Sequence, residues 1–336
     1  MTRRIVVLGS GSIGTYVGGA LLSAGADVIL IGRERMRQRL LQHGLKLSDL
    51  QQREVRLAGS DVPYHVDPHV LASADLILLT VKSSDTAAAA ELILKHANPV
   101  APLLSLQNGI GNVATLRQLL PDREVLGGMV PFNVVQTDDG RLHRGTQGEL
   151  MVQASPSLAT WLPLFVSAHL PLIERTDFIE VQWGKLLLNL NNPLNALSGL
   201  PLKTQLSQRI WRRCLALLVD EALVTLDAAG IVPAQVTKIP PRRLSLLMRL
   251  PDWLFARVAA QMLRIDPEAR SSMWEDLQAG RRTEIDYLNG AVVKLAASLG
   301  RTAPANQQLV MLVRQAEGGA MPALDGKALW RQLQER

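Results

Sequence analysis

The sequence predicts an α/β dinucleotide-binding domain of the Rossmann type followed by an all-helical domain. Short apolar, β-rich runs alternate with helical segments in the first half of the chain, which is typical of a parallel sheet covered on both faces. A glycine-rich turn, GSGSIG at 9–14, follows the first of these runs, and after about residue 175 only helical runs follow. We therefore expect a nucleotide-binding domain over 1–174, a helical domain over 175–318 and a C-terminal tail over 319–336.

The expected elements follow in order along the chain. The strands of the first domain are RIVVLG, DVILIG, DLILLTVK and VAPLLSLQNG, and its helices are SIGTYVGGALLSAG, RERMRQRLLQHG and SDTAAAAELILKHA. Residues 124–152 are expected to form strands joined by turns, since TDDGRLHRGTQGELMVQ is typical of a hairpin. The helices of the second domain are expected at 178–198, 205–229, roughly 241–264, 270–279, 283–299 and 303–316. The stretch GGAMPALDGKALWRQLQER is expected to be a loose tail carrying a docking helix.

Composition narrows the class of protein. The 336 residues exceed the usual size of one compact core, and 47% apolar with 20% charged residues is typical of a soluble globular chain. The net charge of +6 comes with 4% aromatic residues, which argues against a nucleic-acid partner; the basic run GRERMRQR at 32–39 fits small anionic ligands better. The basic start is too short for a signal peptide and no apolar run reaches about eighteen residues, so we expect a cytoplasmic protein with no membrane partner.

Two further features are expected to be structural. Cys214 lies in an apolar helical run and is expected to fill the core, and one cysteine cannot build a zinc site, so we expect no metal. The run LMRLPDWLFARVAAQMLR at 247–264 is apolar enough for a membrane-surface helix, but Asp252 and two interior arginines interrupt its apolar face. A core helix or a helix that packs on a partner is therefore favoured.

The turn GSGSIG has the G-x-G-x-x-G spacing of a dinucleotide site. Gly9 permits the tight turn, Gly11 admits a diphosphate against the backbone, and Gly14 lets helix and strand pack closely. The diphosphate is then expected on the helix N-terminus, which adds the backbone of Ser12 and Ile13 to the cofactor site. The alternative is a plain strand–turn–helix, and the position of the motif between a strand and a helix favours the cofactor.

Cofactor choice depends on the residues after the second strand. Dinucleotide sites for NAD have an acidic residue there, whereas DVILIG runs into Arg33. A guanidinium suits the 2′-phosphate of NADPH by bidentate pairing, so we expect NADPH. An ordinary charged helix face explains Arg35 and Arg37 equally well.

Two more loops follow strands and should lie at the same carboxyl edge of the sheet, where ligands bind in open parallel sheets. The loop TVKSSDT supplies Lys82, and SLQNGIGN supplies Asn108 beside Gly109. The tripeptide Gln107-Asn108-Gly109 is also typical of a simple turn. Its place at a strand terminus favours a contact to cofactor or substrate.

The stretch WGKLLLNLNNPLNALSGL at 183–200 is an apolar helix with a polar stripe. Lys185, Asn189 and Asn192 are spaced i, i+4, i+7 and share one face, while Asn191 and Asn195 fall off it and are expected to be structural. Pro193 cannot donate to the Asn189 carbonyl, so a kink is expected. The stripe favours a ligand-facing surface over amides that satisfy backbone ends at a domain junction.

A second group of candidates lies in SSMWEDLQAGRRTEIDYLNG at 271–290, where Ser272 and Glu284 are the polar side chains of interest. The alternative for its start is an N-cap at Ser271-Ser272 with Glu275 completing a capping box. From spacing alone, a catalytic Glu284 is the weaker interpretation.

Five motifs occur together in one order: GSGSIG, Lys82, QNGIGN at 107–112, WGKLLLN at 183–189 and SSM…TEIDYLNG at 271–290. Together they resemble the ketopantoate reductase (2-dehydropantoate 2-reductase) family over nearly the whole chain. The resemblance implies a Rossmann domain, a helical domain of the 6-phosphogluconate dehydrogenase-like type, an active site in the cleft between them, and NADPH. It also implies reduction of 2-dehydropantoate to pantoate, on the route to pantothenate and coenzyme A.

The resemblance also implies roles for individual residues. Lys185 corresponds to the catalytic lysine, here a general acid, and Glu284 to the acid that assists it and holds the substrate. Asn108, Asn189 and Ser272 correspond to positions that contact substrate or nicotinamide, and Lys82 to a lysine near the cofactor. With Asn192 as a further substrate-orienting residue, these side chains make up the expected site.

Two features depart from the family pattern. The second asparagine, Asn192, precedes Pro193 seven residues after the lysine rather than eight, and the run at 247–264 and the GGAMP tail are not features of the simplest members. The expected substrate is therefore ketopantoate or a related small 2-oxo acid, and a homodimer is left open. The alternatives are another two-domain hydroxyacid dehydrogenase and a non-catalytic NADPH-sensing module.

Overall fold

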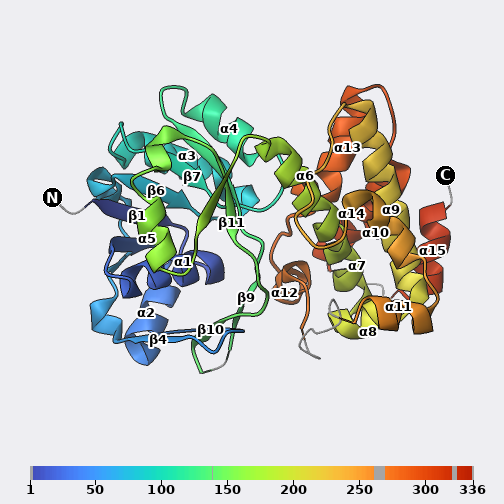
Figure 1. The fold of residues 1–336 in the computed structure, drawn as a ribbon, viewed down its shortest axis with the longest axis horizontal. Coiled ribbons are helices and arrows are strands. Elements are labelled where there is room, and N and C mark those ends of the chain that lie inside the picture. Colours follow the sequence, from blue (N-terminus) through green and yellow to red (C-terminus); the bar gives the residue numbers. More distant parts are fainter. Residues whose placement is uncertain (1–2, 138, 261–268, 320–323, 335–336) are drawn as a thin grey trace. The chain divides into compact units, whose positions relative to one another are not determined.

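The computed structural model describes residues 3–137, 139–260, 269–319 and 324–334. The chain divides into two compact units, Met1–Phe178 and Ile179–Arg336, here called unit 1 and unit 2 (Figure 1). The expected fold class is confirmed, with a mostly parallel sheet in unit 1 and helices in unit 2. The expected boundary between 174 and 175 falls within a strand, Leu172–Arg175, and the division between the units comes after Phe178.

Unit 1 is built on an eight-stranded sheet in the order β12-β11-β8-β7-β6-β1-β2-β5. Its strands are β1 (Arg4–Leu8), β2 (Asp27–Ile31), β5 (Tyr64–His65), β6 (Leu76–Leu79), β7 (Leu103–Ser105), β8 (Val125–Met129), β11 (Leu150–Gln153) and β12 (Leu172–Arg175). All neighbouring pairs are parallel except β8 with β11. The inner strand β1 pairs with β2 on one side and with β6 on the other. The order in which successive strands are added to the sheet therefore reverses at β1. In open α/β sheets this switch point is where ligands bind.

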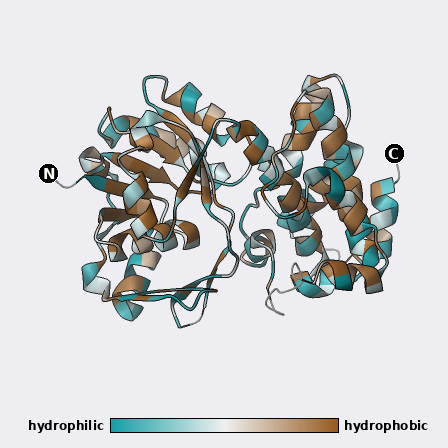
Figure 2. Ribbon diagram, in the orientation of Figure 1, coloured by the Kyte–Doolittle hydropathy of each residue, from teal (hydrophilic) through white to brown (hydrophobic). Residues whose placement is uncertain are grey.

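Both faces of the large sheet are covered by helices. Alternate residues of β1 enter two separate buried clusters, Ile5 and Val7 in one, and Val6 and Leu8 in the other. This alternation follows from the two-residue period of a strand, and it explains why the strands are apolar throughout. The covering helices are α1 (Ser12–Ser23), α2 (Glu34–His43), α3 (Thr86–His96), α4 (Asn112–Leu119) and α5 (Leu162–Ser167). Short 3₁₀ turns lie at Gly59–Asp61, Pro68–Ser73, Ser83–Asp85 and Pro156–Leu158. Figure 2 shows the apolar character of the strands of this large sheet.

A second, four-stranded sheet in unit 1 has the order β4-β3-β10-β9. Its strands are β3 (Leu45–Asp49), β4 (Glu54–Leu57), β9 (Val134–Gln136) and β10 (Arg141–Arg144). The antiparallel β9–β10 pair confirms a hairpin within the expected region 124–152, whereas β10 and β11, the two strands of the run TDDGRLHRGTQGELMVQ, lie in different sheets. Neither the β3–β4 hairpin nor the parallel pairing of β3 with β10 was expected. The strands β3 and β10 lie about a hundred residues apart in the sequence, so no local pattern indicates their pairing.

Unit 2 contains helices and no strand among its described residues. The helices are α6 (Phe178–Asn189, which begins at the last residue of unit 1), α7 (Asn191–Ser198), α8 (Leu202–Ser207), α9 (Arg209–Ala228), α10 (Pro241–Met248), α11 (Asp252–Val258), α12 (Ser272–Gln278), α13 (Asn289–Ser298), α14 (Pro304–Glu317) and α15 (Gly326–Gln334), with a 3₁₀ turn η5 at Ile285–Tyr287. Several expected helices are divided. The expected helix 241–264 is split at Leu250-Pro251, where proline disfavours a helical conformation at the preceding residue. Residues 261–264 of that helix lie outside the described residues.

The described part of the expected tail consists mainly of the expected docking helix, α15, and this part is packed rather than loose. Leu329 and Leu333 of α15 are buried, and α15 packs on α9. A Cβ at Gly326 would lie 2.6 Å from Ile210, so the start of α15 approaches α9 closely. Residues 320–323 and 335–336 of the tail lie outside the described residues.

Cys214 of α9 is fully buried, and desolvation raises the pKa of its thiol to about 12, which fits the expected role in the core.

The segment around α11 is anchored by an arginine in the core. The Arg212 side chain is fully buried, donates to the Leu250 carbonyl and pairs with Asp252. Its guanidinium lies 4.0 Å from the centre of the Phe255 ring. Phe255 is the one buried residue of α11, whereas Trp253 and Val258 are exposed, so the helix joins the core at one position rather than along a whole face. Among the described residues, no helix is both long enough and apolar enough to cross a membrane.

Candidate active site

The glycine-rich turn after β1 leaves no room for side chains at two of its three glycines. Gly9 has φ +104, a conformation that favours glycine, and a Cβ there would lie 2.6 Å from the Val81 amide nitrogen. A Cβ at Gly14 would lie 2.3 Å from the Thr80 Oγ1 and 2.6 Å from the Gly9 carbonyl oxygen. Thr80 Oγ1 donates to that same carbonyl at 2.8 Å. The turn is therefore packed tightly against the end of β6.

The third glycine faces open space. A Cβ at Gly11 would meet no atom within 4 Å. Gly11 is also the N-cap of α1, no side chain caps this helix, and its first turn holds no acidic residue. The first backbone N–H groups of α1, at Ser12 and Ile13, lack helical acceptors, as in every helix N-terminus. An open approach, uncapped N–H groups and the helix dipole together suit the diphosphate of a dinucleotide.

Arg33 is the first residue after the second strand with a long charged side chain. That side chain is 87% exposed, and its guanidinium is 3.8 Å from Asp85 on the 3₁₀ turn after β6. Its backbone is held by the Tyr64 hydroxyl, which donates to the Arg33 carbonyl at 3.1 Å. Arg37 instead pairs with Glu34 along α2, as expected for an ordinary helix face. The Arg33 guanidinium is accessible to an anionic ligand, and Asp85 would compete for it.

The loops that carry Lys82 and Asn108 are joined by a buried hydrogen-bond network. The Asn108 carbonyl accepts from Ser83 Oγ at 2.9 Å and from Asn112 Nδ2 at 2.7 Å. Gln107 is buried and donates to the Val81 carbonyl and to Thr86. The Asn108 side chain is exposed and Lys82 is half-buried. The network fixes both loops at the carboxyl edge of the sheet.

This network contains residues that sequence reasoning missed. Ser83, Thr86 and Asn112 are all nearly fully buried, and Thr86 Oγ1 also pairs with Asn112 Oδ1 at 3.0 Å. Gln107, grouped at first with Asn108 as a contact residue, points inward as a tie between loops. In the sequence, the feature that indicates such a network is the second asparagine of QNGIGN, Asn112, for which a ligand contact at Asn108 gives no reason.

In unit 2 the polar stripe of α6 and α7 is half-buried. Lys185, Asn189 and Asn192 are all partly accessible, while Leu187, Leu190 and Leu194 are buried. Within the described part of the chain, the side chains of the three stripe residues make no hydrogen bond or ion pair. Burial lowers the pKa of the Lys185 ammonium to about 8. Half-buried polar groups of this kind, with no protein partner, suit a ligand-binding face.

The stripe is divided by a break in the helix. Pro193 has no N–H to donate to the Asn189 carbonyl, and the helix is interrupted at Leu190 between α6 and α7. The expected kink is therefore confirmed. Asn192 belongs to α7, whereas Lys185 and Asn189 belong to α6.

The two asparagines off the stripe are structural, as expected. Asn191 exchanges two hydrogen bonds with buried Gln205, at 2.9 and 3.3 Å. Asn195 donates to Gln205 and to the Leu200 carbonyl, and its Oδ1 accepts from the Ser271 amide at 2.8 Å. These buried amides join α7, α8 and the start of α12.

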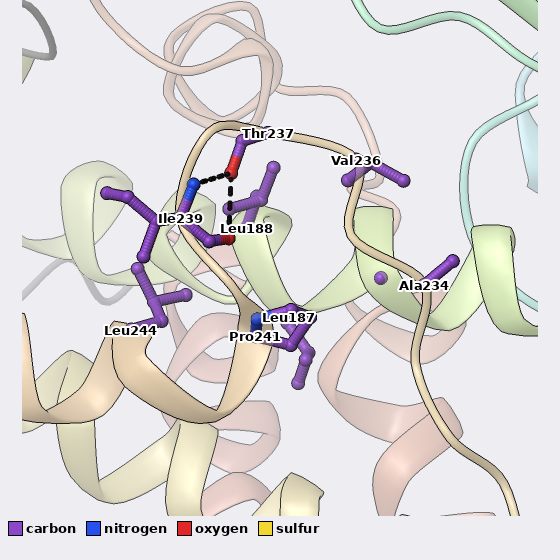
Figure 3. A pocket seen from close by; sticks show the side chains of 9 residues that line it. Leu187, Leu188, Ala234, Val236, Thr237, Ile239, Pro241 and Leu244 are labelled. Carbon is purple, nitrogen blue, oxygen red and sulfur yellow. Dashed lines mark hydrogen bonds between the residues drawn. The ribbon is translucent and has the colours of Figure 1, made fainter.

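The back of α6 is fixed by the segment that follows α9. The Ala234 amide donates to the Glu180 carbonyl at 2.9 Å, and Ala234 lies directly against Gly184. Figure 3 shows the small pocket at this contact, with the bend of the segment closed by Thr237 Oγ1 donating to the Ile239 carbonyl at 3.2 Å. The cavity is about 10 Å³, so it holds at most one water molecule and no substrate.

The start of α12 is capped by Ser271, whose side chain accepts from the Trp274 amide at 3.2 Å. The alternative interpretation is therefore right about the N-cap, but Glu275 is the fourth helical residue, one place past the position that a capping box requires. Ser271 Oγ also donates to the Asn192 carbonyl at 3.1 Å, which brings exposed Ser272 next to the segment that bears Asn192. Half-buried Glu284 lies immediately before η5, on a different element.

Two family models match this arrangement of domains. The ketopantoate reductase PanE/ApbA model matches residues 5–157, and the C-terminal model of the same family matches residues 177–317. The chain belongs to the ketopantoate reductase family. Family membership makes it an oxidoreductase, as expected.

Relatives in the ketopantoate reductase family cover nearly the whole chain. The 2-dehydropantoate 2-reductase of Halobacterium salinarum is 29% identical over 321 residues, which are 94% of this chain and 99% of the relative. The crystal structure of a PanE/ApbA family ketopantoate reductase from Ralstonia eutropha JMP134 has a TM-score of 0.79 and 31% identity, and covers 94% of this chain and 99% of its own.

A further solved structure with the same fold is that of a dehydrogenase in complex with two small molecules. The ternary structure of D-mandelate dehydrogenase with NADH and anilino(oxo)acetate has a TM-score of 0.75 at 20% identity, and covers 94% of this chain and 99% of its own. At this identity the likeness shows the fold alone. The described residues of this chain include no cluster of three or more His, Cys, Asp or Glu side chains able to hold a metal ion.

Proposed function

We propose that the chain catalyses the NADPH-dependent reduction of 2-dehydropantoate, or a related small 2-oxo acid, to the 2-hydroxy acid, with Lys185 as the general acid. The observation that carries this proposal is the half-buried Lys185 ammonium, which has a lowered pKa and no protein partner among the described residues. Family membership supports the reaction class, and the names of the relatives support the substrate class.

The residues of unit 1 fit a nicotinamide dinucleotide. Gly9, Gly11 and Gly14, with the N–H groups of Ser12 and Ile13, would hold the diphosphate. Arg33 would pair with the 2′-phosphate, which distinguishes NADPH from the NADH of the mandelate dehydrogenase structure. Lys82 and Asn108 would contact the cofactor from the neighbouring loops. When bound, NADPH supplies the hydride that reduces the ketone carbon.

Lys185 would act at the carbonyl oxygen. Its ammonium donates a hydrogen bond to that oxygen and stabilises the negative charge that develops as the ketone carbon is reduced. One N–H bond of the ammonium then breaks as the O–H bond of the product forms, and the neutral amine regains a proton from solvent. A pKa of about 8 leaves the ammonium predominant at pH 7 while making it more acidic than an ordinary lysine.

The neighbouring polar side chains would orient the substrate. Asn189 follows Lys185 by about one turn of α6, and Asn192 lies beyond the break, on α7. Ser272 lies next to the segment bearing Asn192, where it would bind a carboxylate or hydroxyl. Glu284 would assist the lysine and hold the substrate, and Asn108 would contact substrate or nicotinamide.

A panel of substrates tests the proposal. Oxidation of NADPH should be fast with ketopantoate or another small 2-oxo acid, and turnover should fall as the pH rises through about 8 because the acid form of Lys185 is lost. Glycerone phosphate and 3-oxo acids are the matched controls. Absence of turnover over a broad 2-oxo acid panel would contradict the proposal and support a non-catalytic NADPH-sensing module.

A second substrate is favoured by one sequence feature. Asn192 comes seven residues after Lys185, directly before Pro193, where the family pattern has eight, and the helix is interrupted at Leu190. This places one orienting amide differently relative to the lysine. A 2-oxo acid with another side chain is then the better substrate, and the ratio of kcat/KM values across the panel decides between the two.

A further inference from the structure

The turn that carries Glu284 is held by a single helix at three points. Residues 283, 286 and 289 each pair with a side chain of α14, and the partners lie progressively earlier along that helix. The three pairs are Thr283 with Glu317, Asp286 with Arg314, and Asn289 with Asn306. The helix α14 therefore acts as a frame for the TEIDYLNG segment.

The first pair lies next to Glu284. One carboxylate oxygen of Glu317 accepts both the Thr283 amide N–H and the Thr283 hydroxyl, each at 2.7 Å. The Thr283 Oγ1 in turn accepts from the Ile285 amide at 3.3 Å. Thr283 is buried and Glu317 is half-buried, so both bonds are partly shielded from water. Glu284 is thus bracketed on both sides by backbone groups whose positions depend on Glu317.

The third pair is fully buried. Asn289 and Asn306 are inaccessible, and Asn289 Nδ2 donates to Asn306 Oδ1 at 3.0 Å. Glu221 fixes Asn306 in turn, by accepting from its Nδ2 at 2.7 Å and from its backbone amide at 2.8 Å. The Oδ1 of Asn289 has no partner among the described residues, so burial of this amide carries a desolvation cost that its bond to Asn306 partly offsets.

The middle pair differs because it lies at the surface. The side chains of Asp286 and Arg314 are 42% and 59% exposed, and exposed pairs of this kind contribute little. Its presence on the same helix offers a matched control.

The position of Glu317 argues for a specific use. It is the last residue of α14, where the helix dipole disfavours a carboxylate. Two short, charge-assisted bonds from Thr283 offset that disadvantage. We propose that Glu317, acting through Thr283, is a positioning residue that sets the direction of the Glu284 carboxylate. This inference rests on the proposed function of Glu284.

The test compares variants of the full chain by kcat, KM and thermal unfolding. Glu317→Ala and Thr283→Val should lower kcat about ten- to a hundredfold, the scale of a misplaced catalytic group, while KM for NADPH stays unchanged. Glu317→Gln and Thr283→Ser keep the acceptor and the hydroxyl, so they should retain most activity and remain informative if the first two variants fold poorly. Arg314→Ala and Gln315→Ala are the controls on the same helix and should behave like the parent.

A double-mutant cycle separates positioning from a general loss of structure. If Glu317 acts through Glu284, Glu317→Ala should have almost no further effect on kcat in a Glu284→Gln background. An equal effect in both backgrounds would overturn the inference. So would normal kcat in Glu317→Ala together with a damaged Glu284→Gln enzyme. Normal turnover in Glu284→Gln would instead overturn the role proposed for Glu284 itself, and the inference with it.

Discussion

Gly184 and Ala234 are in direct backbone contact behind the helix that carries Lys185. A Cβ at Gly184 would lie 2.2 Å from the Ala234 carbonyl oxygen, a distance that real Cβ atoms do not reach. The neighbouring hydrogen bond from the Ala234 amide to the Glu180 carbonyl holds the same segment along α6. The contact between Gly184 and Ala234, which only glycine allows, therefore holds the part of α6 that carries Lys185.

Replacing Gly184 by alanine should move α6 or the segment at Ala234. We expect a loss of about 1–3 kcal/mol of unfolding free energy, despite the better helix propensity of alanine, because backbone atoms cannot yield as side chains can. The reductase rate should fall as well, since Lys185 is the next residue. Thermal unfolding and kcat are the measurements. A variant with unchanged stability and unchanged kcat would show that the contact does not support the lysine.

Lys185→Met should stabilise the protein at neutral pH. The unfolded chain keeps a lysine pKa near 10.5, whereas burial lowers it to about 8 in the folded state. Below pH 8 both states carry the charge, and the folded state bears the full desolvation penalty; as pH rises from about 8 to 10.5 the folded state loses its proton first and the penalty is relieved. The variant should therefore gain about 1–3 kcal/mol at pH 7 and progressively less towards pH 10.5.

Unfolding in denaturant across pH 6.5–10.5 measures this difference. Lys203→Met is the control, since Lys203 is exposed on α8 and its replacement should show no comparable trend. If Lys185→Met were less stable than the parent at pH 7, the lysine would not be a desolvated group kept for function.

Arg33→Ala should weaken the binding of NADPH and leave the binding of NADH nearly unchanged. Loss of charge-assisted bonds to the 2′-phosphate is expected to raise KM for NADPH about ten- to a hundredfold and to leave KM for NADH nearly unchanged. Asp85→Asn should act in the opposite direction, because it removes the carboxylate 3.8 Å from the guanidinium. Arg35→Ala is the matched control. An equal effect of Arg33→Ala on both cofactors would contradict the assignment of the 2′-phosphate site.

The glycines of the turn should respond differently to alanine. At Gly11 nothing lies within 4 Å of the added Cβ, so the variant should fold normally and yet bind NADPH more weakly, about tenfold or more, because the methyl occupies the diphosphate site. At Gly14 the added Cβ would meet Thr80 and Gly9, so stability should fall. Cofactor titration by fluorescence and thermal unfolding separate the two effects. Tight NADPH binding by Gly11→Ala would place the diphosphate elsewhere.

Local patterns predicted much of this structure. The GSGSIG turn, the strand and the helix on either side of it, and the break caused by Pro193 all follow from interactions within a few residues. The distinction between the stripe and Asn191 with Asn195 also followed from helical periodicity alone. These features are local in origin, so the sequence around them is sufficient.

The missed features depend on partners far apart in the chain. The β3–β4 hairpin is stabilised by pairing with β10 about a hundred residues later, and short strands of mixed polarity give a weak local signal. The frame of Glu284 needs Glu317 and Asn306 of α14, whose pairing no spacing rule reveals. The position of the capping box also differed by one residue from the sequence pattern. The Ser271 amide donates to the Asn195 side chain of α7, and Ser271 rather than Ser272 is the N-cap.

The role of Lys185 is tested most directly by single-turnover stopped-flow reduction of ketopantoate, or of the best 2-oxo acid from the panel, by Lys185→Ala loaded with NADPH. The account predicts NADPH binding like that of the parent and a hydride-transfer rate lower by about a hundredfold or more, in keeping with the loss of a general acid. Near-normal hydride transfer with NADPH binding intact would contradict the account.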